Sequence, residues 1–412
     1  YLARCSYLLE RGQSVSDVLW YIGDEISHKP DQEYPFPAGY KYDYCNPDVL
    51  LNRLSVKDGL VVTPEGLSYK FIWIPENKRM LPETLEKLHA LLEQGATVVA
   101  NAPQRICTLA GGDETQARFD KNVEAIWGKA ADGAITTIGK GRLLADVTIE
   151  KAIELLDLKQ DVQGDVRWLH RHVKGADWYF ITPEKQQAFK GKVSFRAQGA
   201  AELWDPITGE ITPLNVERQG EYASIELDMP KAGSCFVVFN HNKKQEKVEK
   251  VELANTQSID NKWTVQFPEG WGAPAELEIE TLAPWCELPM SKEGQAFSGS
   301  ATYTTTFNWS NESKEVVLDL GKVSMIAEVF VNDQKVRTLW CTPYAADITS
   351  YLKQGENKLQ VKVTSTWFNR LAYDASLPEA ERKTWTIEGP KADAKLKEYG
   401  LLGPVTLKSQ AK

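Results

Sequence analysis

The chain has 412 residues, of which 42% are apolar and 25% are charged, close to the average of soluble globular proteins. This composition excludes a disordered chain, a collagen-like chain and a long coiled coil. Acidic residues outnumber basic ones by 57 to 48, a net charge of −9, which argues against nucleic acid as a partner because phosphate binding needs a positive field. No apolar window approaches roughly 18 residues, so we expect no membrane span.

The first ten residues predict an amphipathic helix with Leu2, Cys5 and Leu8 on one face. They contain neither an initiator Met nor a signal-peptide pattern, so we expect the chain to begin inside a longer protein. The six cysteines are scattered and form no C-x-x-C pair. This favours free thiols over a disulfide framework or a zinc ribbon.

Residues 1–160 alternate short apolar runs, typical of buried parallel strands, with helical segments. Pro82 is placed to begin a helix and Gly95 to end it. The alternation predicts a doubly wound α/β sheet. The predicted strands are 18–22, 70–75 and 96–100, and the predicted helices are 48–54 and 82–94.

The rest of the chain is rich in short strands. Residues 165–245 hold seven of them, separated by turn signals, and predict a small β-sandwich. Residues 250–412 contain longer alternating strands, for which we expect a jelly roll. The predicted domains are therefore 1–160, 165–245 and 250–412.

The last of these segments carries a family signature. The runs SATYTTTF at 300–307, LDLGKV at 318–323, AEVFVN at 327–332 and GENKL at 355–359 occur in this order. Their order and spacing resemble the sugar-binding jelly roll of family 2 glycoside hydrolases, which has a galactose-binding-like fold. The fold alone does not imply that the domain binds free glycan, because such modules also brace catalytic domains.

Other stretches resemble α-L-rhamnosidases of glycoside hydrolase family 106. WFNRL at 367–371 and GLLGPV at 400–405 resemble the C-terminal module of that family. GYKYDYCN at 39–46 and VRWLHR at 166–171 resemble the part that follows its catalytic barrel. The resemblance implies that the catalytic acid and base, and a calcium ion, belong to a (β/α)₈ barrel. Nothing in the chain reads as eight strand–helix units, so we expect that barrel to lie upstream and to be missing here.

The domain over 1–160 resembles flavodoxin-type, class I glutamine amidotransferase-like domains. These need a Cys at a sharp strand-to-helix turn. After the third predicted strand the chain reads Asn-Ala-Pro-Gln-Arg-Ile-Cys at 101–107, without Gly-x-Cys-x-Gly or Gly-x-Ser-x-Gly. We therefore expect Cys107 in a loop and a domain that lacks a catalytic triad, which disfavours an amidotransferase or an esterase.

The segment from Pro35 to Asn46 is a candidate for sugar contact, because it combines several aromatic residues with an acid. Aromatic faces stack on the C–H face of a pyranose, and a carboxylate accepts hydrogen bonds from hydroxyl groups. We hypothesise that Tyr40, Tyr42 and Asp43 form a rim that faces the pocket of the missing barrel. The alternative is a contact between domains without a ligand.

Other titratable pairs give weaker hypotheses. Asp24-Glu25 follows the first predicted strand, where ligands bind in α/β sheets, but this pair could instead cap the next element. His170 and His172 share one strand face and could bind a metal, although Arg171 between them favours a solvated edge. We assign no catalytic residue and no metal ligand to this chain.

Four residues of the predicted jelly roll are candidates for a sugar-contacting surface: Trp340, Trp367, Asn369 and Arg370. Arg and Asn side chains donate paired hydrogen bonds to neighbouring hydroxyl groups. The alternative is core Trp with a surface Arg in an ion pair or against another domain. A structural calcium in this domain is left open, although no Asp-rich loop marks one.

The leading interpretation is the non-catalytic C-terminal part of an α-L-rhamnosidase-like glycoside hydrolase that acts on rhamnose-containing polysaccharide. It would brace the missing N-terminal barrel and shape its pocket. The alternative is a stand-alone carbohydrate-binding or scaffold protein whose jelly roll binds glycan. The resemblance implies carbohydrate as a partner and a periplasmic or secreted bacterial location. It also implies calcium in the missing barrel. In this chain we expect no cofactor, apart from the structural calcium that is left open for the jelly roll.

Overall fold

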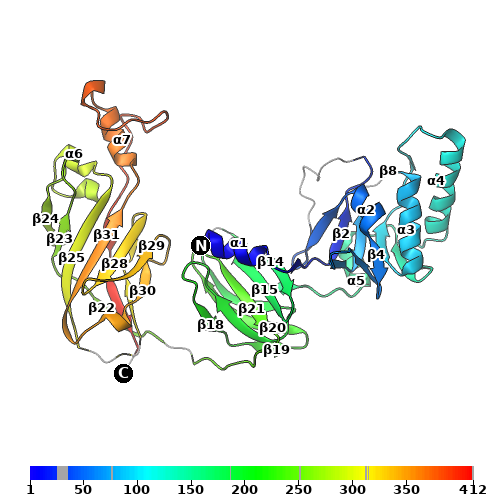
Figure 1. Cartoon of the computed structure of the whole chain (residues 1–412), viewed down its shortest axis with the longest axis horizontal. Helices are drawn as coiled ribbons and strands as arrows, with labels where there is room; N and C mark the ends of the chain where they lie inside the picture. Colours follow the sequence, from blue (N-terminus) through cyan, green and yellow to red (C-terminus); the bar gives the residue numbers. More distant parts are fainter. Residues whose placement is uncertain are drawn as a thin grey trace. The chain divides into compact units, whose positions relative to one another are not determined.

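The computed structural model describes residues 1–25, 36–75, 78–185, 187–249, 252–310, 313 and 315–410. The chain divides into two compact units, Tyr1–Val248 and Glu249–Lys412 (Figure 1). Most of the regular structure is β, in several sheets, with few helices. The first unit holds both the domain predicted over 1–160 and the one predicted over 165–245, and the boundary between those two stays a prediction.

A six-stranded sheet forms the centre of the α/β part of the first unit. Five of its strands are parallel and, counted along the chain, lie in the order 2-1-3-4-5, with one antiparallel strand at the edge. Helices cover both faces, so the central strands β2, β7 and β9 are buried at every residue. In sheet order the strands are β11 (Ile135–Ile138), β12 (Gly141–Leu144), β9 (Thr97–Ala100), β7 (Phe71–Ile74), β2 (Val18–Tyr21) and β3 (Tyr42–Cys45).

Local signals begin and end the helices on this sheet. The side chain of Asn46 accepts a hydrogen bond from the N–H of Val49 and begins α2 (Pro47–Arg53). The helix α3 (Pro82–Gln94) ends at Gly95, whose φ of 120° favours glycine. Both helices were predicted. Two further helices were not: α4 (Gly112–Trp127) and α5 (Ile149–Leu155).

Two antiparallel sheets with a shared apolar core make up the rest of the first unit. The N-terminal segment joins this part and not the α/β sheet, which corrects its placement in the domain over 1–160. The helix α1 (Leu2–Leu9) packs Cys5 against Trp178 and Phe236 beside β15 (Figure 1). The sheets are β1 (Gln13–Ser14), β14 (Val166–Val173), β15 (Ala176–Pro183), β21 (Cys235–Asn240), β17 (Ala200–Trp204) and β18 (Ile211–Pro213); and β13 (Val162–Gln163), β16 (Phe189–Phe195), β20 (Tyr222–Met229) and β19 (Glu217–Gln219).

The second unit also has two antiparallel sheets around one core, in which Trp263, Trp285 and Tyr303 are among the largest buried side chains. Buried and more exposed residues alternate along the long strands, as they do where one sheet face meets a core. One sheet is β24 (Glu276–Ile279), β23 (Trp263–Gln266), β25 (Ser300–Trp309), β31 (Gly355–Thr364), β28 (Ile326–Val331) and β29 (Gln334–Leu339); the other is β22 (Asn255–Ser258), β33 (Thr406–Ser409), β26 (Val316–Asp319) and β30 (Ala345–Asp347).

Shorter elements complete the chain. The small sheets are β4 (Ser55–Lys57), β5 (Leu60–Val62) and β6 (Ser68–Tyr69); β8 (Arg79–Met80) and β10 (Arg105–Ile106); and β27 (Lys322–Val323) and β32 (Leu401–Gly403). The remaining helices are α6 (Lys292–Gln295), α7 (Phe368–Ala375) and the 3₁₀ turns η1 (Trp285–Glu287), η2 (Thr349–Tyr351) and η3 (Glu379–Glu381).

A buried histidine on β14 bridges two carboxylates in the first unit. His170 Nδ1 lies 2.8 Å from Asp161 Oδ2, and Nε2 lies 3.2 Å from Asp177 Oδ1. Ionised carboxylate oxygens only accept hydrogen bonds, so both contacts are satisfied together when both ring nitrogens carry a proton and His170 is an imidazolium. Burial lowers the pKa of His170, but the hydrogen bonds to the two carboxylates outweigh burial and raise this pKa above 6.5.

Asp161 connects this histidine to the α/β part. Its Oδ1 accepts a hydrogen bond from the Tyr179 hydroxyl at 3.2 Å and lies 3.8 Å from Arg196 Nε. Arg196 in turn donates to both oxygens of Asp17, at 2.9 and 3.2 Å. Asp17 immediately precedes β2. A chain of charged side chains therefore runs from the two antiparallel sheets to the start of β2 in the parallel sheet.

Asp177 lies within hydrogen-bond distance of three of the five histidines of the chain. Besides His170, His172 Nδ1 lies 2.7 Å from Oδ1, and His241 Nε2 lies 2.9 Å from Oδ2. Burial raises the pKa of Asp177, but the hydrogen bonds from His170 and His172 outweigh it and hold this pKa at about 2. The carboxylate is therefore ionised at neutral pH.

In the second unit, α7 holds a buried arginine. The side chain of Arg370 is 1% exposed and donates to Asp374 Oδ1 at 2.6 Å and to Glu293 Oε1 at 2.8 Å. The other oxygen of Asp374 accepts from the backbone N–H groups of Lys383 and Thr384. Burial raises the pKa of Asp374, but the hydrogen bonds from Arg370 and Thr384 outweigh it and keep this pKa below its usual value. One carboxylate thus fixes both the arginine and the segment that follows η3.

We predict that His170→Gln lowers the free energy of unfolding by about 3–5 kcal/mol at about pH 6, because it removes the buried cation that bridges Asp161 and Asp177. A raised pKa means that this stabilisation is complete below about pH 6.5 and is lost as pH rises through the pKa of the folded state. Urea unfolding at about pH 6 and about pH 9 measures the difference. The control is His89→Gln, since His89 is partly exposed on α3. An equal effect of His170→Gln at both pH values contradicts an imidazolium.

We predict that Asp374→Asn costs the second unit about 3 kcal/mol or more, because Arg370 then keeps only a partly exposed carboxylate as partner. The lowered pKa of Asp374 places this stabilisation above about pH 4, with loss as pH falls further. Asp333→Asn is the matched control: Asp333 pairs with Lys358 at 2.8 Å on the surface, where such a pair contributes about 0–1 kcal/mol. Equal melting shifts for the two variants contradict the prediction.

Candidate functional site

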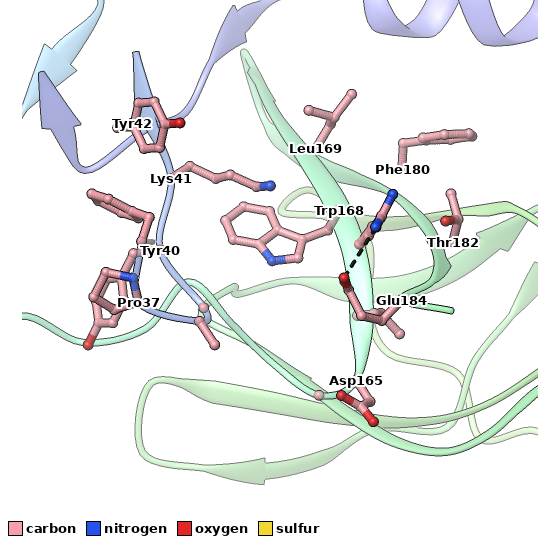
Figure 2. Close-up of a pocket in the computed structure, with 16 residues that line it drawn as sticks. Pro37, Tyr40, Lys41, Tyr42, Asp165, Trp168, Leu169, Phe180, Thr182 and Glu184 are labelled. Atoms are coloured by element: carbon pink, nitrogen blue, oxygen red, sulfur yellow. Dashed lines mark hydrogen bonds and ion pairs between the residues drawn. The ribbon is translucent and has the colours of Figure 1, made fainter. Parts of the chain in front are cut away.

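A cleft of about 970 Å³ lies in the first unit, between its α/β part and the β14–β15 hairpin. One wall is the segment 36–42, and the other consists of residues 164–169 with Phe180, Thr182 and Glu184 (Figure 2). The structure therefore places most of the predicted sugar-contact segment at a cleft. Pro35, the first residue of that segment, lies outside the described residues.

The loop that forms the first wall is held by hydrogen bonds to residues 158–161. The Tyr40 hydroxyl donates to the Leu158 carbonyl at 2.8 Å, the Gln160 side chain to the Ala38 carbonyl at 2.9 Å, and the Asp161 N–H to the Gly39 carbonyl at 2.8 Å. Gly39 has a φ of 83°, and a Cβ there would come within 2.6 Å of a backbone oxygen. This wall is preorganised, because the fold fixes its backbone before any ligand arrives.

Aromatic rings line the cleft on both sides. The Tyr42 ring packs against Phe36 at 4.7 Å and Trp20 at 5.1 Å between centroids, in tilted and edge-on arrangements. On the other wall, the Trp168 indole points toward Lys41, whose Nζ lies 4.9 Å from the ring centroid (Figure 2). Trp168 is buried, so the rings that can present an apolar face to a sugar are the partly buried Phe36 and Tyr42.

Charged groups complete the lining. Arg167 Nε and Glu184 Oε1 form a partly exposed ion pair at 3.3 Å, and Asp165 lies on the same wall (Figure 2). On the facing wall, burial lowers the pKa of Lys41 more than the neighbouring Glu184 carboxylate raises it. The cleft thus offers donors and acceptors for hydroxyl groups beside its aromatic faces.

Asp43 is not part of this cleft, which corrects the predicted rim of Tyr40, Tyr42 and Asp43. The segment forms a strand at Tyr42–Cys45, and successive side chains of a strand point to opposite faces. Tyr42 therefore joins the apolar cluster on the α5 side, whereas Asp43 accepts a hydrogen bond from Tyr69, which belongs to the opposite cluster, at 3.0 Å. The prediction grouped Tyr42 and Asp43 because they are adjacent in the sequence. It did not take into account that neighbouring residues of a strand point to opposite faces.

Asp24 is a hydrogen-bonded side chain beside the start of α3, which itself has no side-chain cap. Its Oδ1 accepts from the Tyr21 and Thr84 hydroxyls at 2.6 and 2.7 Å, and its Oδ2 from the Leu81 N–H at 2.8 Å, at the start of α3. Glu25 pairs with Arg79 at 2.9 Å on the surface. The sequence offered a cap on the next element as the alternative for this pair, whereas Asp24 bonds to Leu81 and Thr84 at α3.

The two histidines weighed as possible metal ligands belong to the carboxylate network. His170 and His172 do share a strand face, but both bind Asp177. Among the residues that the structure describes, no group of three or more His, Cys, Asp or Glu could hold a metal ion. Burial raises the pKa of the Cys107 thiol, which disfavours the thiolate that a nucleophile needs.

In the second unit the four predicted sugar-contact residues separate into two pairs. Trp340 and Trp367 are exposed by 47% and 45%, and the Trp367 ring lies edge-on to Trp271 at 5.0 Å. Asn369 and Arg370 are fully buried and cannot present their donors to a glycan, which corrects that prediction. The helix α7 turns consecutive side chains by about 100°, so exposure of Trp367 does not extend to its neighbours.

Sequence reasoning missed the second wall of the cleft. Arg167 and Trp168 entered the sequence analysis only through a predicted strand and the family resemblance, and Glu184 did not enter it. The pairing of β14 with β15 sets Arg167 opposite Thr182 and brings Glu184 within reach of Arg167. An exposed Arg beside a Trp on a strand was the available signal, but it does not say which loop faces that strand.

No helix among the described residues is long and apolar enough to cross a membrane. A family model described as alpha-L-rhamnosidase, of glycoside hydrolase family 106, matches residues 1–218, and one described as glycosyl hydrolase 2 galactose-binding domain-like matches residues 291–396. The second unit therefore contains a galactose-binding-like domain.

Two individual proteins resemble the chain over most of its length. A rhamnosidase from Novosphingobium sp. PP1Y has a solved structure that matches with a TM-score of 0.90 and 31% identity, over 100% of this chain and 40% of its own. A curated relative from Formosa agariphila, which bears the name of a beta-glucuronidase, is 30% identical over 95% of this chain and 52% of its own. The chain thus spans about half the length of that relative. By its family match, it belongs to glycoside hydrolase family 106, the α-L-rhamnosidase family.

Proposed function

We propose that this chain is the non-catalytic C-terminal part of an α-L-rhamnosidase-like glycoside hydrolase that acts on rhamnose-containing polysaccharide. In this role it braces the catalytic barrel and shapes the edge of its pocket. The observation that carries the proposal is the preorganised cleft of about 970 Å³, which lies within the region that matches the family model. The rhamnosidase of similar structure has a longer chain, of which this one covers 40%.

The carboxylates at the cleft fit glycan contact better than catalysis. Glycoside hydrolysis uses two carboxyl groups about 5–9.5 Å apart, and the acid needs an environment that keeps it protonated. Asp165 is exposed, and the Glu184 side chain is 45% exposed and paired with Arg167. Both are therefore suited to accept hydrogen bonds from sugar hydroxyl groups.

Further parts of the proposal follow the family resemblance. The α/β part of the first unit is taken as flavodoxin-like, which its strand order of 2-1-3-4-5 supports. Calcium is assigned to the barrel of the whole enzyme, and a structural calcium in the β-rich second unit stays open. The second unit is taken as a jelly roll, and the whole enzyme as periplasmic or secreted.

The alternative function is a carbohydrate-binding or scaffold protein in which the second unit binds glycan. The exposed Trp340 and Trp367 favour it, since exposed indoles are the usual stacking faces for sugars. The two functions place the glycan in different units, so variants can separate them.

We predict that the 412-residue chain does not hydrolyse an aryl α-L-rhamnoside above the rate in buffer, measured by release of the chromophore next to an active rhamnosidase. In the cleft, Asp165 is exposed and Glu184 is paired with Arg167, so neither carboxylate is placed to protonate a leaving group. Turnover that is abolished by Asp165→Asn or Glu184→Gln would show that the cleft is catalytic and overturn the proposal.

We predict that a rhamnose-containing oligosaccharide binds the chain and that Leu169→Arg weakens binding at least tenfold, measured by titration calorimetry. Leu169 lines the cleft and is 51% exposed, so a larger side chain occludes the cleft without disturbing the core. Ile211→Arg, at a similarly exposed residue away from the cleft, serves as control. If Trp367→Ala removes binding and Leu169→Arg does not, the alternative function is correct.

A further inference from the structure

Lys41 is a partly buried cation without an anionic partner. Its ammonium lies over the Trp168 ring, and within the described part of the chain it makes no ion pair and donates no hydrogen bond to a side chain or carbonyl. The other cation of the cleft, Arg167, is paired with Glu184 at 3.3 Å. The two cations therefore differ: Arg167 makes a direct ion pair with Glu184, whereas Lys41 feels the Glu184 carboxylate without a direct contact.

This arrangement costs free energy in the absence of a ligand. Removing an ammonium from water without supplying an anion is unfavourable, and attraction to an indole face offsets only part of that cost. The lowered pKa of Lys41 has burial as its main cause and agrees with this reading of the geometry. An anion placed beside Lys41 would restore the missing interaction.

The position of the ammonium is fixed by the fold. The Lys41 carbonyl accepts hydrogen bonds from the N–H groups of Asp17 and Val18, where β2 begins. Its neighbours Tyr40 and Gly39 are held by Leu158 and Asp161. The side chain therefore projects from a rigid backbone toward Trp168 and the facing wall (Figure 2).

The facing wall limits how much negative charge the cleft accepts. Asp165 and Glu184 both lie there, and like charges repel a second acid group. Their oxygens instead accept hydrogen bonds from hydroxyl groups. The lining thus suits a ligand with one acid group at the Lys41 wall and a neutral sugar against the acidic wall.

We propose that the cleft binds an acidic glycan in which the carboxylate of a single uronic acid residue pairs with Lys41, while a neutral neighbouring sugar contacts the Asp165 and Glu184 wall. The inference rests on the proposed function, because it names the class of glycan that the same cleft selects. Lys41 is assigned to binding and selection, and no catalytic step is assigned to it.

The experiment compares matched ligands on the 412-residue chain by titration calorimetry. The probes are rhamnosyl-glucuronic acid and rhamnosyl-galacturonic acid disaccharides, each beside its carboxyl-reduced form, in which the acid is a primary alcohol. We expect at least one acidic probe to bind about tenfold or more tightly than its reduced form, as for a charge-assisted contact. Raising the salt concentration is expected to narrow this difference.

Variants assign the selectivity to one side chain. Lys41→Met keeps the apolar stem over Trp168 and removes the charge, and it is expected to abolish the preference for the acidic form. Lys41→Arg is expected to retain the preference. The control Lys190→Met removes a lysine that is 80% exposed and does not line the cleft, and it is expected to change nothing. Thermal melting of each variant verifies that it is folded.

The outcomes separate this inference from the function on which it rests. If acidic and reduced probes bind the wild-type chain equally, the cleft binds glycan but Lys41 selects no acid, and the inference is wrong while the proposed function stands. If neither form binds, both fail. A preference that survives Lys41→Met in a folded protein places the acid elsewhere and also overturns the assignment.

Discussion

The first unit depends on one protonated histidine. His170 can satisfy Asp161 and Asp177 together only as an imidazolium, because each of its ring nitrogens faces an oxygen that accepts hydrogen bonds. The same Asp161 holds the Gly39 carbonyl through its backbone N–H. A buried charge in the sandwich therefore determines where the wall of the cleft lies, although His170 itself does not line that cleft.

This coupling explains how a cleft can be preorganised between a parallel sheet and a sandwich. Apolar packing alone gives no fixed orientation at such a junction, because it is not directional. The chain from His170 through Asp161 and Arg196 to Asp17 adds directional contacts from both parts. Buried ion pairs are weak evidence for added stability, but geometry of this kind suits the fixing of one arrangement.

The second unit uses the same chemistry for a different purpose. The sequence suggested Arg370 as a hydrogen-bond donor to a sugar. In the structure it donates to Asp374 and Glu293 inside the fold. Asp374 then fixes the backbone at Lys383 and Thr384. Of the residues predicted to contact sugar on this unit, the exposed ones are Trp340 and Trp367. The cleft of the first unit combines charged and aromatic side chains. Family membership alone does not decide which unit binds a ligand, because function depends on the residues of the site and not on the fold.

The sequence by itself determined the elements whose signals are local. The buried runs of β2, β7 and β9, the cap at Asn46 and the glycine after α3 are written in neighbouring residues, as is the family signature. The tertiary structure decided what depends on distant partners. It moved α1 onto the sandwich, turned Asp43 away from Tyr42, buried Arg370 and set Lys41 over Trp168. Local spacing gives the face of an element, but only packing decides what that face meets.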